Sequence, residues 1–157
     1  MLRERLRSTR VGLLAALVAP VVVASCVHAP EEDDHDHSEP DGMIIRQDTI
    51  VLVEIDEQTV TGSLTVQQGE ETEYLTVAFI DHDGDEIELD PSESYLSVTV
   101  VGDDIAEWLQ PVAGEFGGRL RGNASGQATL SFSLVHGEVG SGHPDYISPA
   151  VMAVVTQ

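Results

Sequence analysis

The sequence contains no lysine and a single cysteine, Cys26, among 157 residues. One cysteine excludes a disulfide within the chain. Seven arginines stand against 28 aspartates and glutamates, so the formal net charge is −21. This shortage of cations disfavours nucleic-acid binding, because phosphate contacts require Lys and Arg to displace counterions. The acidity also disfavours direct contact with anionic lipid headgroups and suits cations or a basic partner.

The N-terminal apolar run is short. Val11–Ala24 is uncharged for fourteen residues and contains Pro20. A membrane-spanning helix needs about 20 apolar residues, and proline disfavours a regular helix interior. Arg3, Arg5, Arg7 and Arg10 precede the run, with one acid among them. A basic stretch followed by a short apolar run is typical of a secretory signal peptide, so we expect residues 1–25 to be removed on export.

The apolar run ends in Val23-Ala24-Ser25-Cys26. These four residues resemble the bacterial lipobox. The resemblance implies that the Cys26 sulfur is diacylated and that cleavage occurs just before it, which would fix the exported protein to a membrane of the cell envelope. An unpaired exported thiol is otherwise a liability, and stable anchoring takes more than one acyl chain. The alternative is a non-lipidated signal peptide followed by an incidental cysteine.

Residues 26–42 are predicted to be a disordered acidic tether. Removing 25 residues from 157 leaves 132, enough for one domain, with three of the seven arginines and 27 of the 28 acids. Their formal net charge is therefore −24. Glu31–Asp41 contains seven carboxylates together with His35 and His37. Nothing apolar is present to bury, and like charges repel.

Residues 43–157 are predicted to form one all-β domain, an antiparallel sandwich or barrel. Short β-branched or alternating runs, broken by Gly, Asp and Pro, indicate strands. Asp83-Gly84 predicts a type I′ hairpin, whose two central residues need positive φ. Gly117-Gly118 and Gly122-Asn123 predict corners, and Ile105–Leu109 a short helical turn. The predicted strands are Ile50–Ile55, Ser63–Val66 with Val60 just before it, Tyr74–Ile80, Leu96–Val100, Ala128–Leu134 and Ala150–Val155.

The order of these pieces is similar to bacterial Ig-like domains of group 2. The matching pieces are Leu64-Thr65-Val66, Gly69-Glu70, Leu75–Ile80, Asp83-Gly84, Asp103–Trp108, Gly118–Gly122 and Ala124–Leu134. The resemblance implies an Ig-like β-sandwich used for display or adhesion, with a protein or glycan partner and no catalytic residue. Two departures are an insertion near Glu115–Gly118 and the segment His136–Pro149, which interrupts the approach to the last strand.

Histidines supply the candidate metal ligands. His136 and His143 lie seven residues apart in a glycine-rich segment, with Asp145 two residues further. Such a loop can bring both imidazoles to one Zn²⁺ or Cu²⁺ ion, with Asp145 or Glu138 completing the shell and His82 joining from another hairpin. His35 and His37 would then act as a loading arm. The alternative is ordinary surface histidines on a solvated loop and spacer.

Alternate carboxylates in Asp81–Glu86 also suit Ca²⁺, although an acidic hairpin explains them more simply. For catalysis, no serine stands in a Gly-x-Ser-x-Gly elbow and no pair of carboxylates stands out from the others. We therefore expect a non-enzymatic, lipid-anchored envelope protein that displays an Ig-like domain for binding or adhesion. The alternative is a metal-handling envelope lipoprotein, in which a divalent metal would be the one cofactor.

Overall fold

A computed structural model describes residues 39–112 and 115–157. The predicted signal peptide, Cys26, His35 and His37 lie outside the described residues, as do residues 26–38 of the predicted tether. The tether prediction is wrong at its end, because the Asp41 amide donates to the Ile80 carbonyl and Gly42 begins β1. Every helix-or-strand element in the described part is a β-strand, which confirms the all-β prediction. No helix in this part is long and apolar enough to cross a membrane.

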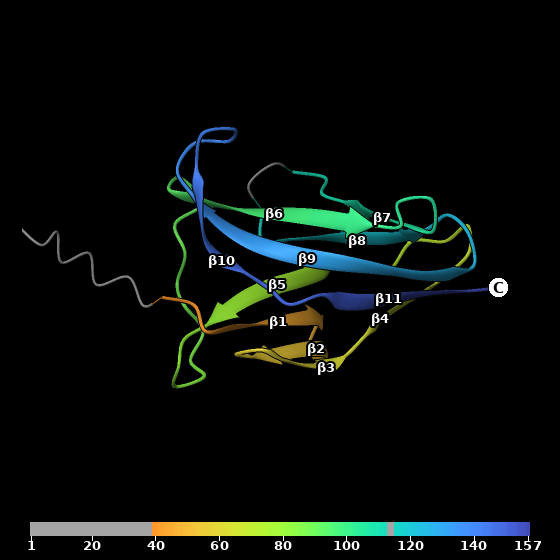
Figure 1. The fold of residues 1–157 in the computed structure, drawn as a ribbon, viewed down its shortest axis with the longest axis horizontal. Helices are drawn as coiled ribbons and strands as arrows, with labels where there is room; N and C mark the ends of the chain where they lie inside the picture. The colour runs from red at the N-terminus through yellow and green to blue at the C-terminus, as the bar shows by residue number, and fades with distance from the viewer. Residues whose placement is uncertain (1–38, 113–114) are drawn as a thin grey trace, which may run out of the picture. The chain divides into compact units, whose positions relative to one another are not determined.

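The strands form two packed sheets (Figure 1). Sheet A has the strand order β3-β2-β1-β5-β8-β7. In sheet B, β6 pairs with one edge of β9, β10 and β11 pair successively with the other edge, and β4 follows β11. The strands are β1 (Gly42–Gln47), β2 (Ile50–Asp56), β3 (Thr59–Gly62), β4 (Leu64–Gln67), β5 (Leu75–Ile80), β6 (Ser94–Val101), β7 (Ala106–Leu109), β8 (Gly117–Gly122), β9 (Gly126–His136), β10 (His143–Ile147) and β11 (Val151–Thr156).

Two-residue alternation fills the space between the sheets. Successive side chains of a strand point to opposite faces, so every second residue enters the core. Phe79 from sheet A and Phe132 from sheet B are fully buried there. Burial alternates along β4, β5, β9 and β11, the runs in which the sequence predicts it. The core is closed within the described residues, and the β-sandwich prediction is confirmed.

One pairing differs from the antiparallel expectation. β4 runs parallel to β11, with Leu64 opposite Ala153. The chain then leaves sheet B, and Gln68 and Glu71 form bridges to Gly122 and Arg121 of β8 in sheet A. One extended segment thus joins β4, an edge strand of sheet B, to β8 of sheet A.

The predicted helical turn at Ile105–Leu109 is wrong. The turn lies just before it, where the Gly102 carbonyl accepts hydrogen bonds from the amides of Ile105 and Ala106. Ala106 to Leu109 then form β7, with Ala106 buried and Glu107 exposed. Two-residue alternation rather than helical periodicity decides this short segment.

Gly117 and Gly118, predicted as a corner, are strand residues of β8, whereas Gly122-Asn123 does mark the connection from β8 to β9. A Cβ on Gly118 would lie 2.6 Å from the Leu109 carbonyl oxygen and 2.6 Å from Cε2 of Trp108. A Cβ on Gly117 would lie 2.5 Å from the Leu75 carbonyl oxygen. Glycine here permits close approach of neighbouring strands, a role that sequence spacing does not distinguish from a turn.

The Asp83-Gly84 hairpin exists, but its turn type is not I′. Only Gly84 takes positive φ there, and Asp81 and Asp85 flank a three-residue loop. The amides of Asp83 and Asp85 donate to the Asp81 carboxylate, each at 3.0 Å. The β1–β2 and β2–β3 hairpins were not predicted. Their turns contain Asp48 and Glu57, which both have positive φ.

Candidate functional site

The β9–β10 hairpin brings together three of the predicted metal ligands. His136 ends β9 and His143 begins β10, and the two are direct cross-strand partners. Their ring centroids lie 5.6 Å apart. Asp145 Oδ1 is 3.2 Å from His143 Nε2, and Oδ2 is 3.9 Å from His136 Nδ1. The segment predicted to be a connecting loop is thus partly the strand β10, and pairing with β9 sets the histidine spacing.

The other predicted ligands do not join this pair. His82 lies on the hairpin after β5, where its Nε2 is 3.3 Å from Asp83 Oδ2. Figure 1 shows that hairpin well separated from the β9–β10 hairpin. His35 and His37 lie outside the described residues. Within residues 39–112 and 115–157, no three or more His, Cys, Asp or Glu side chains are grouped so that they could hold a metal ion.

The acidic hairpin is built by its own hydrogen bonds. The Asp81 carboxylate already accepts two backbone amides. Glu86 forms an ion pair with Arg46 of β1, Oε1 to Nη2 2.6 Å. These contacts account for Asp81 and Glu86 through turn formation and sheet pairing, the simpler of the two interpretations of this segment.

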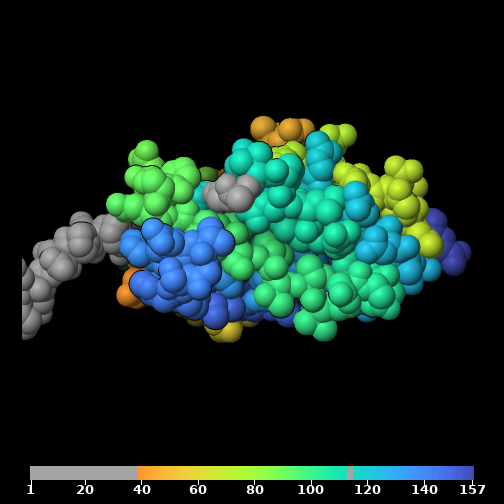
Figure 2. Space-filling model, turned by 90° about the horizontal axis from the view of Figure 1, so that it is seen from above, coloured from red at the N-terminus to blue at the C-terminus, as the bar shows by residue number. Residues whose placement is uncertain are grey.

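A second site, which the sequence analysis did not identify, lies on the outer face of β7 and β8. Glu107 pairs with Arg121 across the ladder, and Leu109 pairs with Arg119. Because Trp108 and Leu120 point toward the core, these four side chains point outward. Figure 2 shows the β6 and β7–β8 segments side by side across one face of the molecule. Arg119 and Arg121, two of the three arginines in the described residues, thus lie on the outer face of β8, two positions apart.

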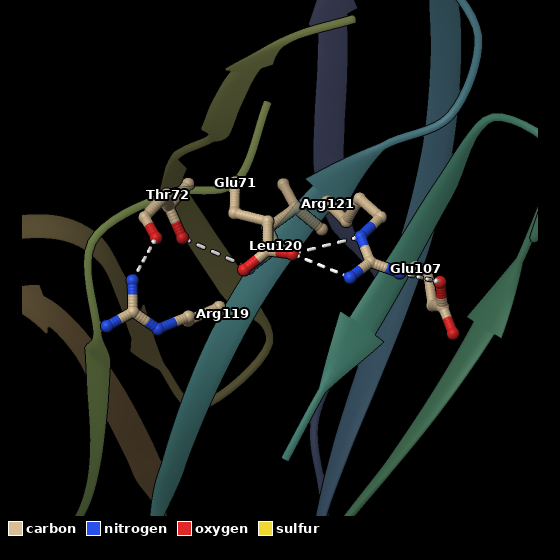
Figure 3. Close-up of polar contacts among 6 residues, drawn as sticks. All are labelled: Glu71, Thr72, Glu107, Arg119, Leu120 and Arg121. Atoms are coloured by element: carbon tan, nitrogen blue, oxygen red, sulfur yellow. Dashed lines mark hydrogen bonds and ion pairs between the residues drawn. The ribbon is translucent and has the colours of Figure 1, made fainter. Parts of the chain in front are cut away.

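Arg121 is the centre of an ion-pair network (Figure 3). Its Nη2 lies 2.6 Å from Glu71 Oε1, and its Nε donates to the same oxygen at 3.1 Å. Nη1 contacts Glu107 Oε2 on the other side at 3.4 Å. The hydrogen bonds to Glu71, with the two carboxylate charges, raise the pKa of Arg121 above its usual value. Arg121 is thus held from both sides, and its charge is matched locally.

Arg119 is held less completely. Its Nη1 donates to the Thr72 carbonyl oxygen at 3.0 Å, and the Glu73 carboxylate lies 4.0 Å from the same nitrogen. Thr72 itself is fixed to β8, because its Oγ1 accepts from the Leu120 amide at 3.0 Å and its own amide donates to the Leu120 carbonyl. A guanidinium has five N–H donors, so Arg119 has donors left for a ligand.

A shallow depression of about 460 Å³ lies over these side chains. The indole Nε1 of Trp108 is buried and has no hydrogen-bond partner among the described residues. The indole itself is fixed edge-on against Phe132, with ring centroids 5.2 Å apart. The depression combines apolar surface with guanidinium donors, a composition suited to binding. Its lining residues are Glu71, Trp108, Leu109, Gln110, Pro111, Arg119 and Arg121.

Two tyrosines outside these sites have shifted pKa values. Burial, followed by the hydrogen bond and charge of Glu115, raises the pKa of Tyr74 to about 12. Burial, followed by the charge of Asp41, raises the pKa of Tyr146 to about 12. The Tyr146 hydroxyl is also buried with no hydrogen-bond partner among the described residues. Both groups therefore stay protonated at neutral pH and bear on stability in alkali.

No protein-family model matches the sequence, and no curated protein matches it. One similar solved structure is the "Crystal structure of the S-layer protein SbsC domains 4 and 5", with a TM-score of 0.43 and 14% sequence identity. The match covers 73% of this chain and 54% of that one, so this chain spans about half of that structure. The strand order and core described above establish the β-sandwich independently of this likeness.

Proposed function

We propose that this chain is an exported, lipid-anchored envelope protein whose β-sandwich binds a protein or glycan partner and carries out no catalysis. The basic leader, the apolar run and Val23–Cys26 support export and anchoring. The observation that carries the binding role is the depression on β7 and β8, where guanidinium donors adjoin the apolar side chains of Leu109 and Pro111. A ligand with carboxylate or hydroxyl oxygens next to an apolar surface would satisfy these groups.

The strand arrangement supports the Ig-like assignment within this proposal. Ig domains divide their strands between a sheet that contains B, E and D and a sheet that contains C, F and G. Here β5, β8 and β7 are adjacent in sheet A, while β6, β9 and the β10–β11 edge are adjacent in sheet B. β1, β2 and β3 extend sheet A beyond β5. A group 2 Ig-like module with an added hairpin fits this order.

The binding proposal is tested by titrating residues 27–157 with envelope glycan fragments and with acidic peptides. Trp108 is the one tryptophan, so its fluorescence reports this site without overlap. Arg119→Gln is expected to weaken binding about tenfold, the effect of losing one charge-assisted hydrogen bond. Arg46→Gln is the matched control, because Arg46 lies on β1 of the same sheet outside the depression. Equal effects of the two substitutions would contradict the assignment of the site.

The anchoring proposal is tested separately in a bacterial host. Wild-type chain is expected in the membrane fraction and to incorporate labelled palmitate, because two acyl chains give stable membrane attachment. Cys26→Ser is expected in the soluble fraction without label, and Ser25→Ala is the control that keeps the small residue before the cysteine. Membrane retention of unlabelled Cys26→Ser would show that the anchor is elsewhere.

A metal-handling function is the second candidate, supported by the approach of His136 and His143 around Asp145. As placed, these three side chains are not grouped so that they could hold a metal ion, so binding would require them to close around the ion with a fourth ligand from water or a further side chain. Calorimetric titration with Zn²⁺ and Cu²⁺ tests this function. Binding lost in His136→Ala/His143→Ala and kept in His82→Ala would support it, and unchanged binding in the double variant would exclude the hairpin as the site.

A further inference from the structure

The outer face of sheet B carries no charged side chain on β4, β6, β9 and β11. The one carboxylate on the described strands of sheet B, Asp145, lies on β10 beside His136 and His143. Leu96 and Leu130 are buried, so their neighbours along β6 and β9 point outward. On β6 these outward residues are Tyr95, Ser97, Thr99 and Val101. The outward positions of β9, β11 and β4 continue this pattern with serine, threonine, glutamine, valine and methionine alone.

Exposed apolar side chains also gather on this face. Val101 is 67% exposed, Ile147 60% and Met152 44%. Val101 and Met152 both lie opposite Thr129, one on each side of β9, and the residues around them form a depression of about 380 Å³. Ile147 lies opposite Ser133 further along β9. The part of the face formed by β4, β6, β9 and β11 is therefore neutral and partly apolar in a chain whose net charge is −21.

We propose that this face binds a second copy of the chain, sheet B against sheet B. Two copies carry the same large negative charge and repel each other, and this face is where they meet without opposing carboxylates. Hydroxyl and amide groups donate and accept hydrogen bonds, so they can pair with their own kind across a two-fold axis. Ionised carboxylates only accept, so they cannot. This interface is distinct from the β7–β8 depression and does not depend on it.

The size of the face sets the strength of the contact. Four strands about 4.8 Å apart and about eight residues long cover roughly 19 Å by 26 Å, or about 500 Å² per copy. Stable complexes bury about 800 Å² per partner, and weak, transient ones bury less. The dimer is thus expected to form and dissociate with concentration rather than to be permanent.

The affinity of this association is expected to depend on ionic strength. The net charges of the two copies repel over about 30 Å at 0.01 M salt but only about 10 Å at 0.1 M. Salt screens this repulsion. A neutral interface contains no ion pairs, so salt does not weaken the contact itself. Association therefore tightens as salt is added, whereas an interface held by ion pairs would weaken.

The test is sedimentation velocity of residues 27–157 over a concentration series at low and high NaCl. Thr99→Glu places a carboxylate in the middle of the face and is expected to raise the dimer dissociation constant at least about tenfold, because like charges then oppose each other. Thr61→Glu is the matched control, since Thr61 is also an exposed threonine but lies on β3 of sheet A. It is expected to leave the dissociation constant unchanged. Circular dichroism verifies that both variants are folded.

Wild-type association that tightens with salt and is lost in Thr99→Glu alone supports the proposal. A wild-type chain that stays monomeric at every concentration and salt overturns it. Equal effects of the two substitutions, or association that salt weakens, also overturn it. So does a monomeric chain in which a neutral glycan, and not protein concentration, shifts the NMR signals of Thr99 and Thr129, because the occupant would then be a sugar.

Discussion

The outer faces of the two sheets are built from the same strand geometry but differ in chemistry. Sheet A presents Arg46, Arg119 and Arg121, each in contact with a glutamate. Sheet B presents hydroxyls, amides and a few apolar side chains. In a chain so short of cations, the three arginines of the described residues all lie on one face, where carboxylates need partners. The outward positions of β4, β6, β9 and β11 avoid the need for partners by carrying no charge.

The two outer faces are suited to different kinds of binding. Ion pairs at an exposed surface contribute little to stability, so the arginine network chiefly fixes side-chain positions around the β7–β8 depression. The hydroxyls and short apolar groups on β4, β6, β9 and β11 carry no charge and leave a surface without charge repulsion. Sheet A is thus suited to a ligand with oxygen acceptors, and sheet B to a neutral surface like itself.

Gly118→Ala is expected to have the largest effect, because it forces β7 and β8 apart. The added Cβ would lie 2.6 Å from the Leu109 carbonyl oxygen, and an overpacked site costs about 1–3 kcal/mol. Thermal unfolding should show the loss, and Trp108 fluorescence should shift because the same Cβ meets the indole. Gly69→Ala is the control: its Cβ meets nothing within 4 Å, so stability falls through backbone strain but the indole signal stays. An unmoved indole in Gly118→Ala would contradict the close packing.

Thr72→Ala is expected to lower stability more than the loss of a hydroxyl from the outer face of sheet B. It leaves the partly buried Leu120 amide without its acceptor, and such a loss costs about 1 kcal/mol in the free energy of unfolding. Thr65→Ala removes an outward hydroxyl of β4 on sheet B and is expected to change stability by less than about 0.5 kcal/mol. Urea unfolding measures both. Equal losses would mean that the outer residues of the two sheets are equally engaged.

Tyr146→Phe tests the core that both faces share. Removing a buried hydroxyl that has no partner is expected to stabilise the fold by up to about 1 kcal/mol at neutral pH. In the wild type, the raised pKa means that stability is fully present below pH 10 and is lost as pH rises through about 12. The variant should lose less stability across that window in urea unfolding at stepped pH. An unchanged pH profile would show that Tyr146 is not desolvated.

Strands were predictable where apolar and polar residues alternate clearly, and were missed where glycines interrupt that alternation. β5, β9 and β11 follow directly from alternating apolar residues. β8 was missed, because Gly117 and Gly118 are signals for a turn in the sequence and for close strand approach in the structure. β10 was missed because Gly137, Gly140 and Gly142 hide the pairing of His143 with His136.

The contacts within the two sites also differ in how far the sequence predicts them. The approach of His136 to His143 was predictable, since seven residues and a glycine-rich loop bring them together. The network of Arg121 was not, because Glu71 lies 50 residues away and Glu107 14 residues away. A signal was present in the arginines, since Arg119 and Arg121 at two-residue spacing on a strand point the same way. Only the register of β7 on β8 shows which carboxylates they meet.

The most direct test is one NMR experiment on residues 27–157 that separates the two faces. Ligand is added at constant protein concentration, and protein is then diluted without ligand. The account predicts that ligand shifts the Trp108 indole and the β7–β8 amides, while dilution shifts Thr99, Val101 and their neighbours on β9. Two separate sets of signals would confirm a division of labour between the sheets, and one shared set would contradict it.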